Sequence, residues 1–530
     1  MTASGKRGSR RSSRSTARAE PVPERPSRWR SFLSWGAYAG VLAWIVLSNL
    51  NPVLTNDIWV HLRIGQDVLA SHQPPQVDVY SAVAGGRPFI SHEWLAAVVF
   101  ALVDRFWTGG VGLSALNLCA ALGLAAMLYF AAPKTWRGSF HFIPLFVLCL
   151  HQVFFRMMVR PHLFSLLALS AFALGLERWR RTGRWRDLLW LVPAEVLWAN
   201  LHGSAPFGPV VLGAMTAAAA LAAGVSWLAP RAGNERTYGW RDVGQLGATT
   251  GACILAMLVN PYGPRLFTFS FFMAEGNEYI KKAIYEWGPT WTTPVHYINY
   301  WFWSYVLILV LAWVSLLAIA RTRPIMDFFV LAVVTYVSCQ AQRFTVYATI
   351  FAFPMLVRNL PTALGALAQR RGFRRRPLFE LLGAALLLVW TIPGGYPQNP
   401  REKRPIGWGY GGRMPYAEIK QIKEGGYHGV MFNEYADGAP LIFSLYPEIK
   451  PVMDSRIDIY GEQLFSEYQK AESNLQAFFA YLSKYHVNLV MRFRNRQNRA
   501  VYDALERNPA WKLAFRTNTR FLFVARDSGS

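Results

Sequence analysis

The sequence predicts an α-helical polytopic membrane protein with about eleven spans, followed by a small soluble α/β domain. Hydrophobic residues make up 53% of the 530 residues and charged residues only 16%, whereas soluble globular proteins carry about a quarter charged residues. Apolar runs long enough to cross a bilayer recur along the first three quarters of the chain. From about Tyr396 the pattern changes to alternating short strands and helices, which is typical of a small α/β layer.

The chain divides into three parts by composition. Residues 1–30 are rich in Ser, Arg and Pro without apolar periodicity, which predicts a disordered, basic cytoplasmic tail. A membrane domain is expected over 31–395 and a soluble domain over 396–530. The expected spans are 32–54, 111–131, 139–155, 162–177, 187–201, 206–228, 244–260, 300–320, 325–341, 343–358 and 378–394.

The basic loops decide the topology, because Lys and Arg concentrate on the cytoplasmic side of membrane proteins. If the short apolar segment 92–107 does not cross, the basic loops 177–186, 230–242 and 369–377 all fall inside. Residues 55–110 then form the first outer loop, with 92–107 as a juxtamembrane helix. The N-terminus is expected in the cytoplasm and the C-terminal domain on the outer side of the membrane.

The net charge of +24 does not indicate a nucleic-acid partner, because the Arg residues lie in the N-terminal tail and in short loops between apolar runs. The four cysteines all fall inside apolar segments without a CxxC pair. A disulfide framework and a thiolate metal site are therefore not expected. No internal repeat is visible.

The soluble part shows a regular order of elements. Strands are expected at 429–433, 449–455 and 487–493, and helices at 439–446, 461–484 and 498–507. A final strand pair is expected at 511–516 and 520–526. The segment VMDSRIDIYG concentrates Asp454, Arg456 and Asp458, for which a salt-bridge network at a strand end is the favoured interpretation.

With this topology, polar residues beside the apolar runs gather on the outer side, and ionisable groups at membrane depth mark functional sites. Asp57 and His61 share one helix face, and His92 and Glu93 follow after a short loop. Two carboxylates beside imidazoles suit a general base or a divalent-metal site, the latter with Asp57, His92 and Glu93 as ligands. The alternative role for Asp57 is a helix N-cap, and His61 is expected mainly as a structural partner within the site.

Cationic and amide side chains complete the candidate substrate site. Arg156, Arg160 and His162 lie between two spans, and Arg343 lies between two others. Guanidinium groups suit phosphate oxygens, although Arg can also extend to lipid headgroups. Asn200 and His202, in LWANLHGS, could bind sugar hydroxyls, or could cap helices and bond between them.

These features together resemble the GT-C class of integral-membrane glycosyltransferases. The features are an acidic residue in the first outer loop (Asp57 in NDIWVHL), a second one at a juxtamembrane helix (Glu93 in SHEWL), many spans and an outer soluble domain. WANLHG, NPYG and FNEYADGAPLIF…PVMDSRIDIYG are similar to segments of bacterial multi-pass proteins grouped with that class. The first loop reads NDIW rather than the paired-acid form of several members, which puts metal dependence in question.

The resemblance implies transfer of a sugar from a polyprenyl-phosphate donor, with inversion, at the outer face of a bacterial membrane. The acceptor would be a glycan, a lipid or a protein, and membrane lipid surrounds the domain. Asp57 would act as the base, the Arg cluster would stabilise the departing phosphate, and a divalent metal is the one cofactor left open. The alternative function is a transporter or flippase that binds the same lipid-linked or polymeric glycan without chemistry.

Overall fold

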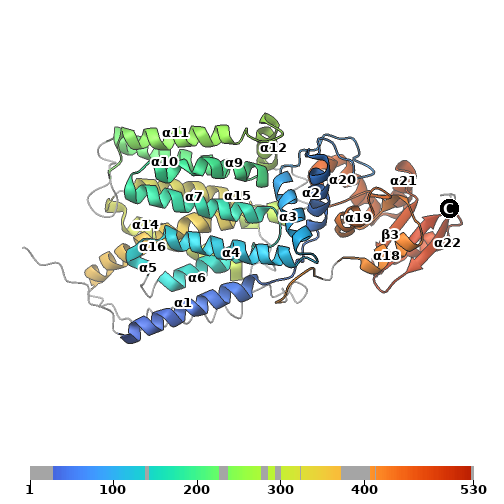
Figure 1. The fold of residues 1–530 in the computed structure, drawn as a ribbon, viewed down its shortest axis with the longest axis horizontal. Coiled ribbons are helices and arrows are strands. Elements are labelled where there is room, and N and C mark those ends of the chain that lie inside the picture. The colour runs from blue at the N-terminus through green and yellow to red at the C-terminus, as the bar shows by residue number, and fades with distance from the viewer. Residues whose placement is uncertain are drawn as a thin grey trace, which may run out of the picture.

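The computed structural model describes residues 28–137, 142–225, 237–275, 284–292, 300–322, 324–371, 406–411 and 414–526. Figure 1 shows an elongated molecule with two parts, a bundle of long helices and a smaller C-terminal domain that contains the sheet. Two helices from the segment expected as the first outer loop lie between the two parts. The N-terminal tail 1–27 and the expected span 378–394 lie outside the described residues.

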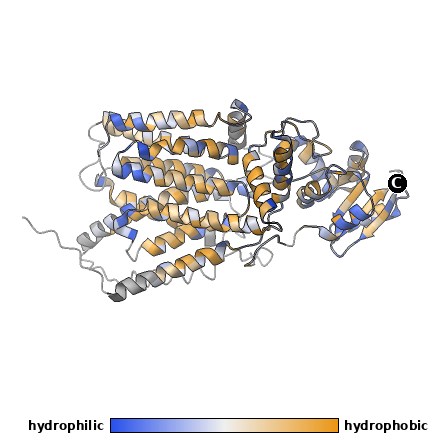
Figure 2. Ribbon diagram, viewed as in Figure 1, coloured by the Kyte–Doolittle hydropathy of each residue, from blue (hydrophilic) through white to orange (hydrophobic). Residues whose placement is uncertain are grey.

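The long helices of the bundle run along the long axis of the molecule (Figure 1), and Figure 2 shows that hydrophobic residues dominate them while hydrophilic residues gather toward their ends. The short helices α5 (Lys134–Arg137) and α8 (Arg186–Leu189) precede α6 and α9. The helices of this part are α1 (Arg28–Asn49), α4 (Val111–Ala131), α6 (Phe142–Phe154), α7 (His162–Thr182), α9 (Leu191–Leu201), α10 (Phe207–Gly224), α11 (Trp240–Ala256), α12 (Pro264–Glu275), α14 (Tyr300–Ala318), α15 (Ile325–Gln340) and α16 (Thr345–Arg371).

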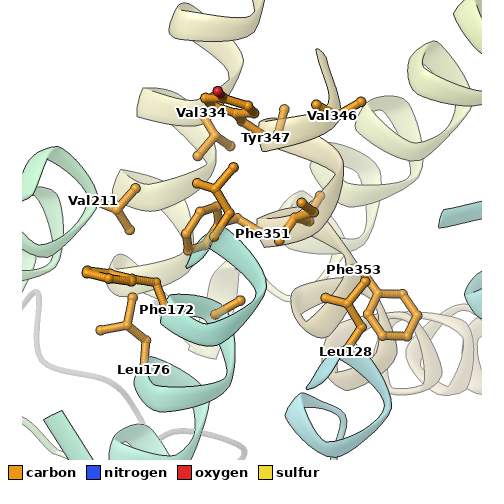
Figure 3. Packing of buried hydrophobic residues seen from close by; sticks show 14 of the residues in the cluster. Leu128, Phe172, Leu176, Val211, Val334, Val346, Tyr347, Phe351 and Phe353 are labelled. Atoms are coloured by element: carbon orange, nitrogen blue, oxygen red, sulfur yellow. The ribbon is translucent and has the colours of Figure 1, made fainter. Parts of the chain in front are cut away.

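Helix α16 packs at the centre of the bundle. Its side chains Tyr347, Phe351 and Phe353 lie in one buried cluster with Leu128 of α4 and Phe172 of α7 (Figure 3). This core is formed by aromatic and aliphatic side chains from many helices, so close packing fixes the helices relative to one another.

Two of the described helices, α4 and α10, are both long and apolar enough to cross a bilayer. Shorter apolar helices occupy Gly36–Asn49, Phe142–Phe154, Phe302–Ala318 and Ile325–Gln340. The expected span over 187–201 is divided between α8 and α9. The count of eleven spans therefore stays a prediction.

Helices α2 (Ile58–Ser71) and α3 (Trp94–Phe106) form a pair at the end of the bundle that faces the C-terminal domain (Figure 1). Their close approach requires Gly65, because a Cβ atom there would come within 2.1 Å of the carbonyl oxygen of Ala97. Helix α3 covers most of the segment 92–107 and lies across the end of the bundle rather than within it.

The C-terminal domain contains a five-stranded sheet in the order β2-β1-β3-β5-β4. β1 runs parallel to β2 and β3, whereas β5 is antiparallel to both β3 and β4. The expected α/β layer is confirmed. Its elements are α18 (Tyr416–Glu424), β1 (Gly429–Phe432), α19 (Gly438–Leu445), β2 (Ile449–Pro451), α20 (Ile457–Ser473), α21 (Leu475–Lys484), β3 (Leu489–Phe493), α22 (Arg499–Arg507), β4 (Trp511–Arg516) and β5 (Arg520–Ala525).

Two sequence-based expectations for this domain are wrong in detail. The single helix expected over 461–484 is two helices, because the side chain of Asn474 accepts a hydrogen bond from the backbone N–H of Ala477 and caps the second one. The strand expected over 449–455 ends at Pro451. The residues that follow turn toward the first loop, where Asp454 and Arg456 form the expected salt bridge.

This salt bridge extends beyond the C-terminal domain. Nε and Nη2 of Arg456 donate to the two carboxylate oxygens of Asp454 at 2.9 and 2.7 Å, and Nη1 donates to Asp78 of the first loop at 2.6 Å. The two carboxylates are fully buried. Tyr460 donates a further hydrogen bond to Asp454 at 2.6 Å. Arg456 therefore joins the C-terminal domain to the first loop through paired, buried charges.

Substitution of Arg456 by Met should destabilise the protein by about 3–5 kcal/mol, because it leaves two buried carboxylates without their cation. Thermal unfolding in detergent would measure this as a large fall in melting temperature. Arg499→Met is the matched control: its pair with Asp503 is exposed and should contribute less than about 1 kcal/mol. Equal melting temperatures for the two variants would contradict a stabilising role for the buried bridge.

Candidate functional site

A cavity of about 450 Å³ lies where the helical bundle, the first loop and the C-terminal domain meet. Most of its charged and polar lining comes from segments that follow or precede helices, so the helices position these residues. The lining residues are Asn51, Pro52, Val53, Leu54, Thr55, Asn56, Asp57, Asn117, Phe155, Arg156, Met157, Met158, Val159, Arg160, Glu286, Tyr435, Ala436, Ala439 and Ser455.

Two ion pairs dominate the chemistry of this cavity. Nη2 of Arg160 lies 3.2 Å from Oδ2 of Asp57, and Nη1 of Arg156 lies 2.6 Å from Oε2 of Glu286. Asp57 precedes α2 but makes no side-chain capping hydrogen bond. Its carboxylate faces Arg160 instead, so the interpretation of Asp57 as a helix cap is not supported.

Glu286 belongs to a short 3-10 helix, η2 (Tyr285–Trp287), and was not among the predicted catalytic residues. Burial alone would raise the pKa of this carboxyl, but Arg156, Arg343 and Arg160 hold it below its usual range. The guanidinium of Arg343 stacks over the ring of Trp287, 4.2 Å from the ring centroid. Glu286 is therefore an anion surrounded by three arginines.

The arginines of the cavity retain hydrogen-bonding capacity. Nε of Arg156 and Nε of Arg160 are buried and donate to no described residue. A guanidinium offers five donors in a planar fork, and buried donors normally find an acceptor. These two atoms could donate to an anionic ligand such as a phosphate.

The C-terminal domain supplies one wall of the cavity with Tyr435 and Ser455. The two segments that carry these residues approach closely at Gly438, where a Cβ atom would come within 2.0 Å of the carbonyl oxygen of Met453. The amide of Asn433 donates to that same oxygen at 2.8 Å. The segments FNEYADGAP and VMDSRIDIYG are thus held together, and each contributes a polar residue to the cavity.

Glu93 lies in a separate cluster, outside the residues that line the cavity. Its carboxylate oxygens lie 3.5 Å from Nε2 of His61, 3.6 Å from Nε2 of His92 and 3.4 Å from Nε2 of His202. Burial opposes its negative charge, but the three imidazoles, with His92 foremost, hold the pKa of Glu93 below its usual range. The pKa of His92 is raised by the same contact in spite of burial.

The orientation of His202 follows from its other ring nitrogen. The backbone N–H of Ser204 donates to Nδ1 of His202 at 3.2 Å, so Nδ1 is an acceptor and the proton must sit on Nε2. This N–H then faces Glu93. Burial lowers the pKa of His202 to about 3, so the ring contacts Glu93 as the neutral imidazole.

Asn200 is a predicted residue whose side chain is occupied by contacts within the protein. Oδ1 of Asn200 accepts a hydrogen bond from the indole of Trp94 at 3.0 Å, and its Nδ2 donates to the carbonyl of Val259 at 2.8 Å. This is the interhelical role left open by the sequence. His162 lies beside His202, with ring centroids 6.5 Å apart, and its buried Nε2 has no hydrogen-bond partner among the described residues.

The structure therefore divides the predicted site into two groups. Asp57, Arg156 and Arg160 meet in the cavity, whereas His61, His92, Glu93 and His202 form the adjacent cluster. No three His, Cys, Asp or Glu side chains among the described residues are placed to hold a metal ion. Asp57, His92 and Glu93 do not assemble as the metal ligands that the sequence left open.

Comparison with solved structures shows the fold. The chain is similar to the oligosaccharyltransferase AglB of Archaeoglobus fulgidus, solved with an inhibitory peptide and a dolichol-phosphate, at 10% identity and a TM-score of 0.55, over 88% of this chain and 70% of that one. It is also similar to ArnT of Cupriavidus metallidurans bound to undecaprenyl phosphate, at 12% identity and a TM-score of 0.50, over 95% and 99% of the two chains.

A further AglB structure, solved with zinc and sulfate, matches with 11% identity and a TM-score of 0.51, over 86% of this chain and 68% of that one. No family model and no curated protein sequence matches the chain. The GT-C resemblance noted in the sequence is thereby confirmed at the level of the fold. At these identities the roles of individual residues rest on the geometry described above.

The histidine cluster predicts a dependence of stability on pH. The folded-state pKa values of His61 and His202 are lowered from 6.5 by burial, so the unfolded chain binds more protons as the pH falls below 6.5. Stability should then fall from pH 6.5 toward pH 5, by about 1–2 kcal/mol for His202 alone. The raised pKa of His92 changes the stability only at pH values above 6.5. The lowered pKa of Glu93 changes it only below pH 4.5, the ordinary pKa of a Glu.

Melting temperatures in detergent between pH 7 and pH 5 would measure this effect. His202→Gln should flatten the slope, because Gln cannot take up a proton. His428→Gln, at an exposed position of the C-terminal domain, should leave the slope as in the wild type. Parallel slopes for all three proteins would contradict a buried neutral His202.

Proposed function

We propose that this protein is a membrane glycosyltransferase that moves a sugar from a polyprenyl-phosphate carrier to an acceptor hydroxyl. The observation that carries the proposal is the Asp57–Arg160 ion pair in a cavity that also holds the Arg156–Glu286 pair. The fold supports it, because the solved neighbours include one with a dolichol-phosphate and one bound to undecaprenyl phosphate.

Asp57 would act as the general base. Its Oδ2 faces Arg160, while its Oδ1 accepts no side-chain hydrogen bond from the described residues and can receive the acceptor hydroxyl. The hydroxyl proton passes to Asp57 as the acceptor oxygen bonds to the anomeric carbon. The bond from that carbon to the phosphate oxygen breaks, and its electron pair leaves with the phosphate. Attack opposite the leaving group inverts the anomeric carbon.

The arginines would stabilise the leaving phosphate, whose negative charge increases as the bond breaks. Nε of Arg156 and Nε of Arg160 are donors without a protein acceptor among the described residues. A phosphate can also compete with Asp57 for the guanidinium of Arg160, which would release the carboxylate for proton transfer. Donor binding would in this way prepare the base.

The cavity is proposed to open on the outer side of a bacterial inner membrane, with the C-terminal domain outside the cytoplasm. The support for this orientation is the distribution of basic loops in the sequence, which falls on one side when α3 does not cross. In the structure α3 lies beside α2 at the end of the bundle. The acceptor is a glycan, a lipid or a protein, presented from that outer side.

Asp57→Asn should lower the turnover number at least about a hundredfold, which is the usual contribution of a general base. Donor binding should be retained or tightened, because Arg160 loses its competing carboxylate. The measurement is transfer from a panel of polyprenyl-phosphate sugars in nanodiscs, with donor binding followed separately and with and without a chelator.

Asp67→Asn is the matched control for that substitution. Asp67 lies on the same helix but pairs with Arg63 and does not line the cavity, so transfer should stay near the wild-type rate. Full activity of Asp57→Asn would remove Asp57 as the base. Movement of the lipid-linked glycan across the bilayer without transfer from any donor would favour the flippase instead.

A reporter enzyme that is active only outside the cytoplasm should be active when fused after Ser530. The same reporter inserted after Gly183, which follows α7 within the basic segment 177–186, should be inactive, because that segment is expected inside. Expression of both fusions at equal levels is the control. Activity in the reverse pattern would overturn the proposed orientation and with it the outer location of the cavity.

A further inference from the structure

Asn117 is a polar residue of the cavity that neither the ion pairs nor the proposed chemistry uses. It lies on α4, a helix long and apolar enough to cross a bilayer, and it lines the cavity together with Asn51 and the ion-paired residues. Its side chain is almost completely buried, with 2% exposed. The cavity therefore reaches an amide within the helical bundle.

The orientation of the Asn117 amide is fixed by a backbone group. Nδ2 of Asn117 donates to the carbonyl oxygen of Asn49 at 3.0 Å. A carbonyl oxygen can only accept, so the nitrogen must face it and Oδ1 must point the other way. Oδ1 is buried and accepts no hydrogen bond from the described residues.

A buried acceptor without a donor costs stability, and native proteins keep few of them. The bond from Nδ2 to the carbonyl of Asn49 accounts for one end of the amide, but it leaves the cost of the unpaired Oδ1 unexplained. The retained amide is explained when a ligand in the cavity supplies the missing donor. A phosphate in its ionised form has only acceptor oxygens, so it cannot be that group, whereas a sugar hydroxyl can donate.

We propose that Oδ1 of Asn117 accepts a hydrogen bond from one hydroxyl of the transferred sugar and thereby determines which sugars are used. The proposal rests on the proposed glycosyl transfer and adds the chemical class that the cavity recognises beyond the phosphate. A site that hydrogen-bonds a substrate hydroxyl rejects analogues that lack it, because its own polar group is then left without a partner. Asn117 is accordingly a specificity-determining residue.

The loop segment around Asn51 holds this part of the cavity in place. The backbone N–H of Val53 donates to the carbonyl of Gly409 at 2.7 Å, and the N–H of Gly411 donates to Val53 at 2.8 Å. The hydroxyl of Ser114, one helical turn before Asn117 on α4, accepts from the N–H of Gly409 at 3.2 Å. The chain that follows α1 and the start of α4 are thus fixed to one another through the same segment.

The experiment compares the best donor of the wild type with its monodeoxy analogues, one hydroxyl at a time. For the wild type, removal of one particular hydroxyl should lower kcat/KM about tenfold or more. For Asn117→Leu, the parent donor and that analogue should be used equally well, at the rate of the wild type with the analogue. The melting temperature serves as the control for folding, because the substitution removes the unpaired acceptor and also the Nδ2 donor to the carbonyl of Asn49.

Asn49→Leu is the matched control. Asn49 is also buried with an unpaired Oδ1, but it does not line the cavity, and its backbone carbonyl remains available to Asn117. This variant should keep the preference of the wild type among the deoxy donors. Asn117→Ala serves as a second variant should Asn117→Leu fail to fold, and it should lose the same preference.

Two outcomes overturn the proposal. A lower melting temperature in Asn117→Leu with the preference among donors intact assigns Asn117 to folding alone. Loss of preference among deoxy acceptors, with the donor preference intact, assigns the hydroxyl to the acceptor instead.

Donor binding, followed as a shift in melting temperature, separates this proposal from the proposed function. The wild type could transfer no sugar and still bind the parent donor more tightly than one deoxy analogue, while Asn117→Leu binds both equally. This result would support the hydroxyl contact and contradict the proposed transferase activity. Equal binding of all donors by wild type and variant refutes the hydroxyl contact.

Discussion

The geometry of the cavity depends on one buried guanidinium. Arg456 binds Asp454 of the C-terminal domain and Asp78 of the first loop, and both carboxylates are fully buried. Without a cation between them, two buried carboxylates would repel each other and force the domain away from the loop. Because Ser455 lies between Asp454 and Arg456 in the chain, the bridge that docks the domain also sets one wall of the cavity.

The segment around Tyr435 is also held by contacts that reach the first loop. Gly438 allows the backbone of α19 to touch the carbonyl of Met453, and the amide of Asn433 bonds to that carbonyl. Helix α19 in turn packs on α2, where the rings of Phe443 and Trp59 are 5.2 Å apart. Asp57 immediately precedes α2. Asp57 and the wall of the cavity that contains Tyr435 are therefore linked through the contact between α2 and α19.

The sequence was sufficient for elements with a local cause. Hydrophobic runs gave the helices of the bundle, and alternating patterns located the sheet strands within a few residues. The helix break at Asn474 also had a local signal, because an Asn before an amphipathic segment is a typical helix N-cap. The start of the second helix could therefore have been predicted from the sequence. Asp57, Arg156 and Arg160 were recognisable because charged residues beside apolar runs are rare.

Other features had no local signal. The contact of Arg160 with Asp57 joins residues 103 positions apart, and Glu286 reaches Arg156 from a loop still further along the chain. Tyr435 and Ser455 belong to segments that were conspicuous in the sequence, but only the tertiary structure places them at the cavity. Glu93 was paired with Asp57 by proximity in sequence, whereas three imidazoles draw its carboxylate into a separate cluster.

The charges of the cavity bear on the proposed binding of a phosphate. Asp57 and Glu286 balance Arg160 and Arg156, so the four lining charges cancel. An arriving phosphate can be accommodated by exchange, since it takes donors from an arginine that already has a carboxylate partner. Arg343, held on the ring of Trp287 and close enough to influence Glu286, adds a positive charge behind the pairs. In the proposed transfer, a surplus positive charge there would favour the state in which the leaving phosphate has gained its second negative charge.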